Sequence, residues 1–168
     1  MREGYRWEYY TLLFNEENYK FMFAALKEAE LAFDEDEVPI GAVVVYNNRI
    51  IGKGYNQVEK LKDPTAHAEI LALTAAANHL KEKVLSECDL YVTVEPCLMC
   101  IGAISLAKIH NLYFSTYEPK SGSCGSIYNI PDENKLNHKV NVYTGIYENE
   151  SKQLMQQYFQ KKRKEIQG

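Results

Sequence analysis

Four residues in two short stretches carry the side chains of a metal-dependent catalytic site. His67 and Glu69 lie in the stretch Asp-Pro-Thr-Ala-His-Ala-Glu-Ile-Leu, and Cys97 and Cys100 lie in Glu-Pro-Cys-Leu-Met-Cys. One imidazole and two thiolates are ligands that zinc prefers, and together they leave one tetrahedral position open for water. Structural zinc sites fill all four positions, so three ligands with a carboxylate alongside predict a catalytic site.

Glu69 is the candidate proton shuttle of this site. Zinc bound by two thiolates and a neutral imidazole is formally uncharged, so it acidifies its water less than an all-histidine site, where the water pKa is about 7. A carboxylate must take the proton as zinc-bound hydroxide forms, and it can then deliver that proton to the substrate. This chemistry suits attack on an amidine-type ring carbon with loss of ammonia.

The spacing of the four residues restricts where the metal lies. Residues two apart on a regular helix point to different sides, so His67 and Glu69 can converge only where side chains lean toward a helix start. Cys97 and Cys100 share one face of the first turn of the following helix, where the helix dipole favours thiolates. We therefore expect the metal beyond two helix N-termini that face each other across adjacent strands.

The elements that must position these residues follow from apolar periodicity. The predicted elements are helices over 18–33, 66–80, 97–107 and 148–166, and strands over 38–46, 49–55, 90–94, 112–114 and 140–145. Asn47-Asn48 predicts a hairpin because asparagine tolerates positive φ. The strand over 38–46 is apolar on both faces, which predicts an interior position, and Gly52 and Gly54 are expected to loosen the end of the next strand. The alternation of strands and helices from residue 50 onward favours a sheet sandwiched between helices.

Length and composition are typical of one globular domain over 1–168. The chain has 168 residues, 46% of them hydrophobic and 25% charged. The first residues lack the apolar run of a signal peptide, and the longest apolar stretches, 38–46 and 98–107, are too short to cross a bilayer. Two of the four cysteines have ligand spacing, which favours a reducing cytoplasm over a disulfide framework. We treat 1–17 as an N-terminal extension and 148–166 as a C-terminal helix.

Charge gives an ambiguous signal about nucleic acid. The formal net charge of −4 argues against such a partner, but Lys161-Lys-Arg-Lys164 concentrates four cations in one helical turn. A solvated helix end favours cations through the helix dipole, so this cluster is either such an end or an RNA-binding surface.

The chain also resembles a known family. His67-Ala-Glu69 with Pro96-Cys-x-x-Cys100 is similar to the signature of the zinc-dependent cytidine deaminase superfamily, whose members act on nucleobases. Within it, the chain from about residue 20 to residue 166 resembles the bacterial tRNA adenosine deaminases. The stretches that carry this resemblance are Glu-Val-Pro-Ile-Gly-Ala-Val at 37–43, Asn56, Asp-Pro-Thr-Ala-His-Ala-Glu-Ile at 63–70, Tyr-Val-Thr-Val-Glu-Pro-Cys at 91–97, Lys-x-Gly-x-x-Gly-Ser at 120–126, and Asn137-His138.

The resemblance implies a fold, a reaction and partners. The fold would be α/β, a three-layer α/β/α sandwich with a five-stranded mixed sheet of the cytidine deaminase type. The reaction would convert adenosine to inosine at the wobble position of a tRNA anticodon loop, with one Zn²⁺ per subunit. The tRNA would be an arginine tRNA, and the enzyme would be a homodimer whose interface borders the active site.

By matching position, the resemblance also implies substrate contacts. Asn56 would hydrogen-bond the flipped nucleotide, and three apolar residues would line its base: Val38, Ala66 and Val94. The residues that would contact the flanking RNA are Glu118, Lys120, Tyr158, Phe159, Lys162 and Arg163. Glu118 stands where the family has Asp, and Val94 where Leu is more usual. The first twenty residues and residues 130–135 follow no family pattern.

Two other functions fit the same residues. A deaminase of a free base, cytosine or guanine, would use the same zinc chemistry, and only activity on an anticodon stem-loop against free bases separates it from an RNA enzyme. A zinc-stapled RNA-binding module without turnover would need Cys88 or Cys124 as a fourth ligand, and it leaves Glu69 without a purpose.

Overall fold

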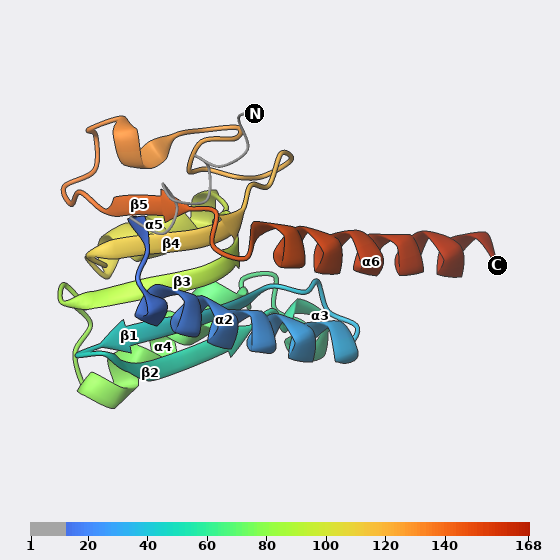
Figure 1. Cartoon of the computed structure of the whole chain (residues 1–168), viewed down its shortest axis with the longest axis horizontal. Helices are drawn as coiled ribbons and strands as arrows, with labels where there is room; N and C mark the ends of the chain where they lie inside the picture. Colours follow the sequence, from blue (N-terminus) through green and yellow to red (C-terminus); the bar gives the residue numbers. More distant parts are fainter. Residues whose placement is uncertain (1–12) are drawn as a thin grey trace, which may run out of the picture.

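A five-stranded mixed sheet with helices on both of its faces forms the body of the chain in the computed structural model, which describes residues 13–168 (Figure 1). Its elements are α2 (Glu16–Asp34), β1 (Gly41–Tyr46), β2 (Arg49–Tyr55), α3 (Val58–Leu61), α4 (Ala68–Leu80), β3 (Cys88–Val94), α5 (Leu98–Leu106), β4 (Asn111–Thr116), the 3₁₀ helix η1 (Ile130–Asp132), β5 (Asn141–Thr144) and α6 (Glu148–Gln167). The predicted α/β class and three-layer sandwich are confirmed.

The sheet has the strand order β2-β1-β3-β4-β5. β1 is antiparallel to β2 and to β3, whereas the pairs β3–β4 and β4–β5 are parallel. The β1–β2 turn places both Asn47 and Asn48 at positive φ, 47° and 60°, as a tight hairpin turn requires. Because β1 pairs with a strand on each side, it lies inside the sheet, as its two apolar faces predicted.

Alternate residues of the central strands point into two separate cores. Ala42 and Val44 of β1 join the core beneath α4 and α5, while Val43 and Val45 join the core beneath α2. Every one of these four side chains is buried, with 6% exposure or less. This period of two gives each face of the sheet its own core.

Gly52 and Gly54 bring α4 close to β2. A Cβ at Gly52 would lie 2.4 Å from the carbonyl oxygen of Ala72, and one at Gly54 would lie 2.3 Å from that of Ala68. These glycines were expected to loosen the end of the strand, but the structure shows instead that they let the backbone of α4 pack against it. The backbone of α4, which begins one residue after His67, rests directly on β2.

The connections differ from the predicted ones in two places. The four-residue helix α3 was not predicted, because one turn is too short to show a period. Between the parallel strands β4 and β5, where no helix was predicted, the chain contains only the short η1. The strands that precede α4 and α5 were expected to be adjacent, but β1 separates β2 from β3 because the hairpin places β2 at the sheet edge.

α6 lies on the same side as α2 and extends well beyond the sheet (Figure 1). Within residues 13–168, no helix is long and apolar enough to cross a membrane.

Candidate active site

The three predicted metal ligands converge on one point. Nδ1 of His67 lies 3.6 Å from Sγ of Cys97 and 3.6 Å from Sγ of Cys100. All three ligand atoms lie within 4.8 Å of one another, although thirty residues separate His67 from Cys97. The group can hold a metal ion.

Both helix starts aim their side chains at this point. His67 is the N-cap of α4 and Cys97 is the N-cap of α5, each with extended backbone angles. The predicted helices over 66–80 and 97–107 therefore begin slightly later, at Ala68 and Leu98. Neither N-cap side chain accepts a hydrogen bond from its own helix, so both are available to the metal site.

Hydrogen bonding among the ligands adjusts their protonation. Hydrogen bonding with Cys100 lowers the pKa of the Cys97 thiol to about 4, which makes Cys97 a thiolate at neutral pH. Hydrogen bonding with Cys97 raises the pKa of the His67 imidazole. The thiolate at the start of α5 is the form that binds metal.

Glu69 lies beside the ligands, in the first turn of α4, and is only 3% exposed. Burial raises the pKa of its carboxyl group to about 7, and the charges of Cys97 and His67 act on it in opposite directions. A carboxyl group with this pKa can both accept and release a proton near neutral pH, as general acid–base catalysis requires.

The alternative of a closed structural site lacks its fourth ligand. Cys88 and Cys124 are buried free thiols, and neither belongs to the group formed by His67, Cys97 and Cys100. Among residues 13–168 that group has three ligands, and three ligands leave a position open.

Asn56 is buried near this site and has a carboxylate partner that was not predicted. Its Nδ2 donates to Oε2 of Glu37 at 3.4 Å, and the same carboxylate accepts from the backbone N–H groups of Glu59 at 3.1 Å and Lys60 at 2.7 Å. Glu37 therefore fixes both Asn56 and the start of α3. The signal available in the sequence was that Glu37 begins one of the stretches that carry the family resemblance.

Two of the three predicted base-lining residues, Ala66 and Val94, lie next to the ligand segments. Ala66 precedes His67 and Val94 ends β3, and each is 1% exposed. Val38 is half-buried between α2 and β1. Of the two predicted RNA contacts in the loop after β4, Glu118 is half-buried and its carboxylate accepts from the Lys120 backbone N–H at 2.9 Å, while the Lys120 side chain is exposed.

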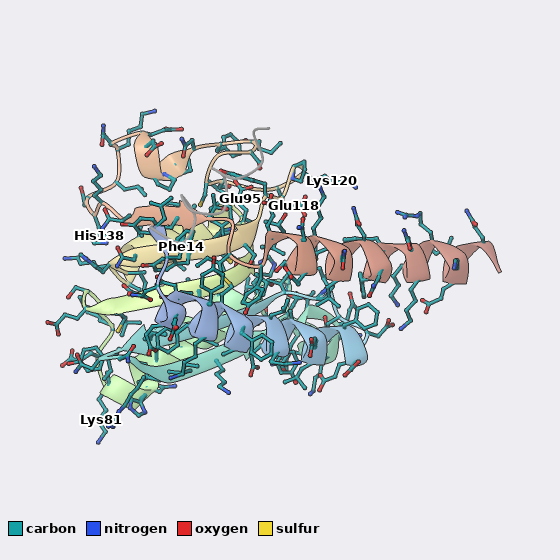
Figure 2. The ribbon with its side chains drawn as sticks, in the orientation of Figure 1. Phe14, Lys81, Glu95, Glu118, Lys120 and His138 are labelled. Atoms are coloured by element: carbon teal, nitrogen blue, oxygen red, sulfur yellow. The ribbon has the colours of Figure 1, made fainter. Side chains whose placement is uncertain are left out.

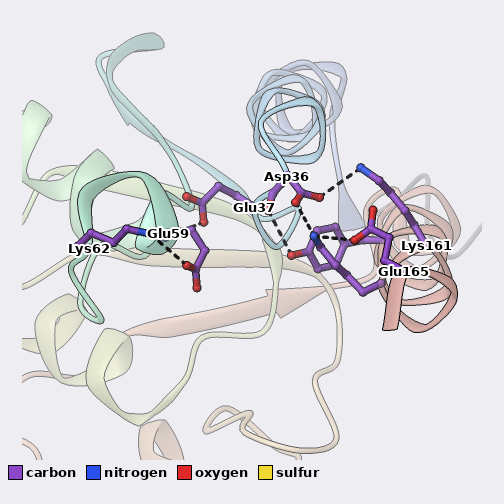
Figure 3. Close-up of polar contacts among 8 residues, drawn as sticks. Asp36, Glu37, Glu59, Lys62, Lys161 and Glu165 are labelled. Carbon is purple, nitrogen blue, oxygen red and sulfur yellow. Dashed lines mark hydrogen bonds and ion pairs between the residues drawn. The ribbon is translucent and has the colours of Figure 1, made fainter. Parts of the chain in front are cut away.

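The predicted RNA contacts on α6 divide into two groups, one of which faces Asp36. Figure 3 shows Asp36 beside Lys161 of the same helix. Tyr158 is 7% exposed and donates from its hydroxyl to the carbonyl oxygen of Asp36 at 3.3 Å. The Asp36 carboxylate also pairs with Lys161 at 3.2 Å and with Lys162. Phe159 is 43% exposed and Arg163 is also exposed. Half of the basic cluster thus neutralises an acidic residue of the chain itself.

The fold and the ligand group with its neighbouring carboxyl define a deaminase. The sequence model of a family described as MafB19-like deaminase matches residues 16–163. More narrowly, the chain belongs to the tRNA-specific adenosine deaminases. A relative of that name from Aquifex aeolicus is 46% identical over 146 residues, which cover 87% of this chain and 96% of the relative. One from Agrobacterium fabrum is 43% identical, covering 85% and 94%.

Solved structures agree with this family. One, from a study of A-to-I editing by tRNA:A34 deaminases at the wobble position of transfer RNA, has 43% identity and a TM-score of 0.78. It covers 80% of this chain and 98% of its own. A guanine deaminase from Bacillus subtilis has 30% identity and a TM-score of 0.59 over 77% of this chain and 85% of its own. The resemblance read from the sequence is confirmed.

Proposed function

We propose that this chain converts adenosine to inosine at the wobble position of a tRNA anticodon loop by hydrolytic deamination. The observation that carries the proposal is the meeting of His67, Cys97 and Cys100 beside the buried carboxyl of Glu69 in a member of this family. A cytoplasmic location fits a tRNA substrate.

The ligand distances support zinc. In a tetrahedral site with Zn–N of about 2.1 Å and Zn–S of about 2.3 Å, nitrogen and sulfur ligands lie about 3.6 Å apart. The distance from His67 Nδ1 to each of the two sulfurs is 3.6 Å. One imidazole with two thiolates favours zinc among the common divalent ions. One Zn²⁺ per subunit would supply Lewis-acid activation of a water molecule.

Glu69 moves the proton in the proposed reaction. Its carboxylate takes a proton from the attacking water and delivers it to the ring nitrogen N1, while the water oxygen bonds to the ring carbon that carries the amino group. It then moves the remaining hydroxyl proton to the amino nitrogen, which leaves as ammonia, and the base becomes hypoxanthine. The raised pKa of Glu69, about 7, supports both proton transfers at neutral pH.

The substrate contacts are proposed by matching position. Asn56, oriented by Glu37, hydrogen-bonds the flipped nucleotide, and Val38, Ala66 and Val94 line its base. The residues proposed to contact flanking RNA are Glu118, Lys120, Phe159, Lys162 and Arg163. Tyr158 supports them from beneath, because its ring packs against the ring of Phe33 in α2, with the two ring centroids 6.3 Å apart. An arginine tRNA is the proposed substrate.

Inosine formation tests the proposal. The purified chain should produce inosine at the wobble position of an arginine anticodon stem-loop and leave free cytosine and guanine unchanged. The similarity to a guanine deaminase makes free-base deamination the second candidate. Turnover of guanine with none of the stem-loop would reverse the assignment.

We also propose a homodimer through the outer face of α5. Leu98 and Leu106 are 55% and 83% exposed on this helix, and a Cβ at Gly102 would meet nothing within 4 Å. The interface would border the active site because the same helix carries Cys100 on its buried face. Leu106→Lys should halve the molar mass measured by light scattering, whereas Leu31→Lys on α2 should leave it unchanged.

A further inference from the structure

Glu95 is a buried carboxylate at the junction between the sheet and the metal-ligand segment. It follows β3 directly and is 3% exposed, and only Pro96 separates it from Cys97. Among residues 13–168 no Lys, Arg or His forms an ion pair with it. A buried carboxylate is destabilising unless it is hydrogen-bonded, so Glu95 needs partners other than cations.

Both oxygens of Glu95 accept hydrogen bonds from a single loop. Oε1 accepts from the backbone N–H of Cys124 at 2.8 Å and of Ser126 at 3.0 Å. Oε2 accepts from the backbone N–H of Glu118 at 2.9 Å and from the hydroxyl of Ser126. The loop 118–126 thus closes around one carboxylate, with donors from its two ends.

The loop is built to approach this carboxylate. A Cβ at Gly122 would lie 2.2 Å from Oε2 of Glu95, so only glycine fits there. The next residue, Ser123, donates its N–H to the carbonyl oxygen of Pro96 at 2.9 Å, and Gly122 forms a β-bridge with Cys97. The loop and the ligand segment are therefore joined at Glu95, Pro96 and Cys97.

We propose that Glu95 is a positioning residue that fastens the substrate-facing loop 118–126 to the strand end leading into the metal ligands. The inference rests on the proposed function, because it concerns Glu118 and Lys120 as RNA contacts. Figure 2 shows Glu95, Glu118 and Lys120 close together at the end of the sheet where α6 begins. Through Glu95, the position of the ligand segment sets where this loop meets the RNA.

Glu95→Gln tests this role with little change in size. The amide supplies one oxygen and one NH₂ group where the carboxylate supplies two oxygens. The NH₂ group can donate to the Ser126 hydroxyl, but it then faces the N–H of Glu118, which loses its acceptor. We expect the KM for an anticodon stem-loop to rise about tenfold, the effect of one lost buried hydrogen bond. We expect kcat to change less than threefold and zinc per chain to stay at one.

Three further measurements make the outcome decisive. Hydrogen exchange of the Glu118 amide should become faster in Glu95→Gln, independently of turnover. Ser126→Ala, which removes one donor and folds more readily, should raise the KM about threefold. Glu82→Gln, the same substitution at an exposed site after α4, should change neither the KM nor the exchange rate of the Glu118 amide. Lys81, its neighbour, lies on the far side of the body from Glu95 (Figure 2).

Two results would overturn the inference. One is an unchanged KM with an unchanged exchange rate at Glu118. The other is joint loss of zinc and kcat at a constant KM, which would make Glu95 a support of the metal ligands alone. If the unaltered chain makes no inosine, the proposed function fails, and the exchange rates alone still decide whether Glu95 fastens the loop.

Discussion

At the scale of single residues, the environment of Glu69 determines what its carboxyl can do. An exposed glutamate is fully ionised at neutral pH, but burial in the first turn of α4 raises the pKa of Glu69 to about 7. Glu69 does not belong to the ligand group, which consists of His67, Cys97 and Cys100. One side chain thus acts on protons while its three neighbours are available to the metal.

Glu69→Gln separates these tasks. Glutamine has nearly the same shape but cannot carry a proton, so kcat should fall at least 100-fold while zinc per chain stays at one. Inosine release from a stem-loop gives kcat, and elemental analysis gives zinc. Retention of more than a tenth of kcat would assign the proton transfer to another group.

At the scale of elements, the packing of α4 on β2 places His67 and Glu69. Gly52→Ala would put a methyl group 2.4 Å from the carbonyl oxygen of Ala72, so α4 must move. We expect a loss of about 1–3 kcal/mol in the free energy of unfolding, as in other overpacked cores. Urea denaturation measures it. Lys53→Ala is the matched control, because Lys53 is exposed on the same strand and its ion pair with Glu28 contributes little.

Asp36 holds the next pair of elements, the α2–β1 turn and α6, together. Hydrogen bonds from Lys162 and Lys161 lower the pKa of Asp36 below its value in the unfolded chain. The stability this gives is present above the unfolded pKa, about 3.9, and is lost as pH falls through the folded value. Melting temperatures between pH 7 and pH 3 should therefore fall more steeply for the unaltered chain than for Asp36→Asn. Parallel curves would show that this contact does not stabilise the fold.

The sequence predicted that His67, Cys97 and Cys100 would come together, and the structure brings them together. This was possible because metal chemistry restricts both the residue types and the spacing within each stretch. The sequence did not predict the roles of Glu37 and Glu95, because most of their partners are backbone N–H groups, which nearly every residue type supplies. It likewise missed that Lys162 pairs with Asp36, because 126 residues separate the two. The two helices begin slightly later than predicted, at Ala68 and Leu98, because apolar periodicity does not separate an N-cap residue from the first residue of its helix.

At the scale of the whole molecule, the net charge of −4 means that the proposed RNA binding would depend on cations that are not already paired with acidic residues. Arg163 has no ion pair among the described residues, whereas the ammonium of Lys162 already neutralises Asp36. Arg163→Gln should weaken stem-loop binding and reduce the slope of log affinity against log salt by nearly one. Lys162→Gln should reduce it less. Equal, unchanged slopes in both variants would remove the end of α6 from the interface.

The projection of α6 beyond the sheet has a consequence for how much RNA the molecule can span. A helix of 20 residues is a stiff rod about 30 Å long, and this one is clamped to the α2–β1 turn at Tyr158 and Lys162. If α6 contacts the RNA as proposed, the length of helix beyond this clamp would set the farthest nucleotide that α6 reaches. Adding or removing one turn past the clamp would lengthen or shorten that footprint by about 5 Å without altering the chemistry at the metal.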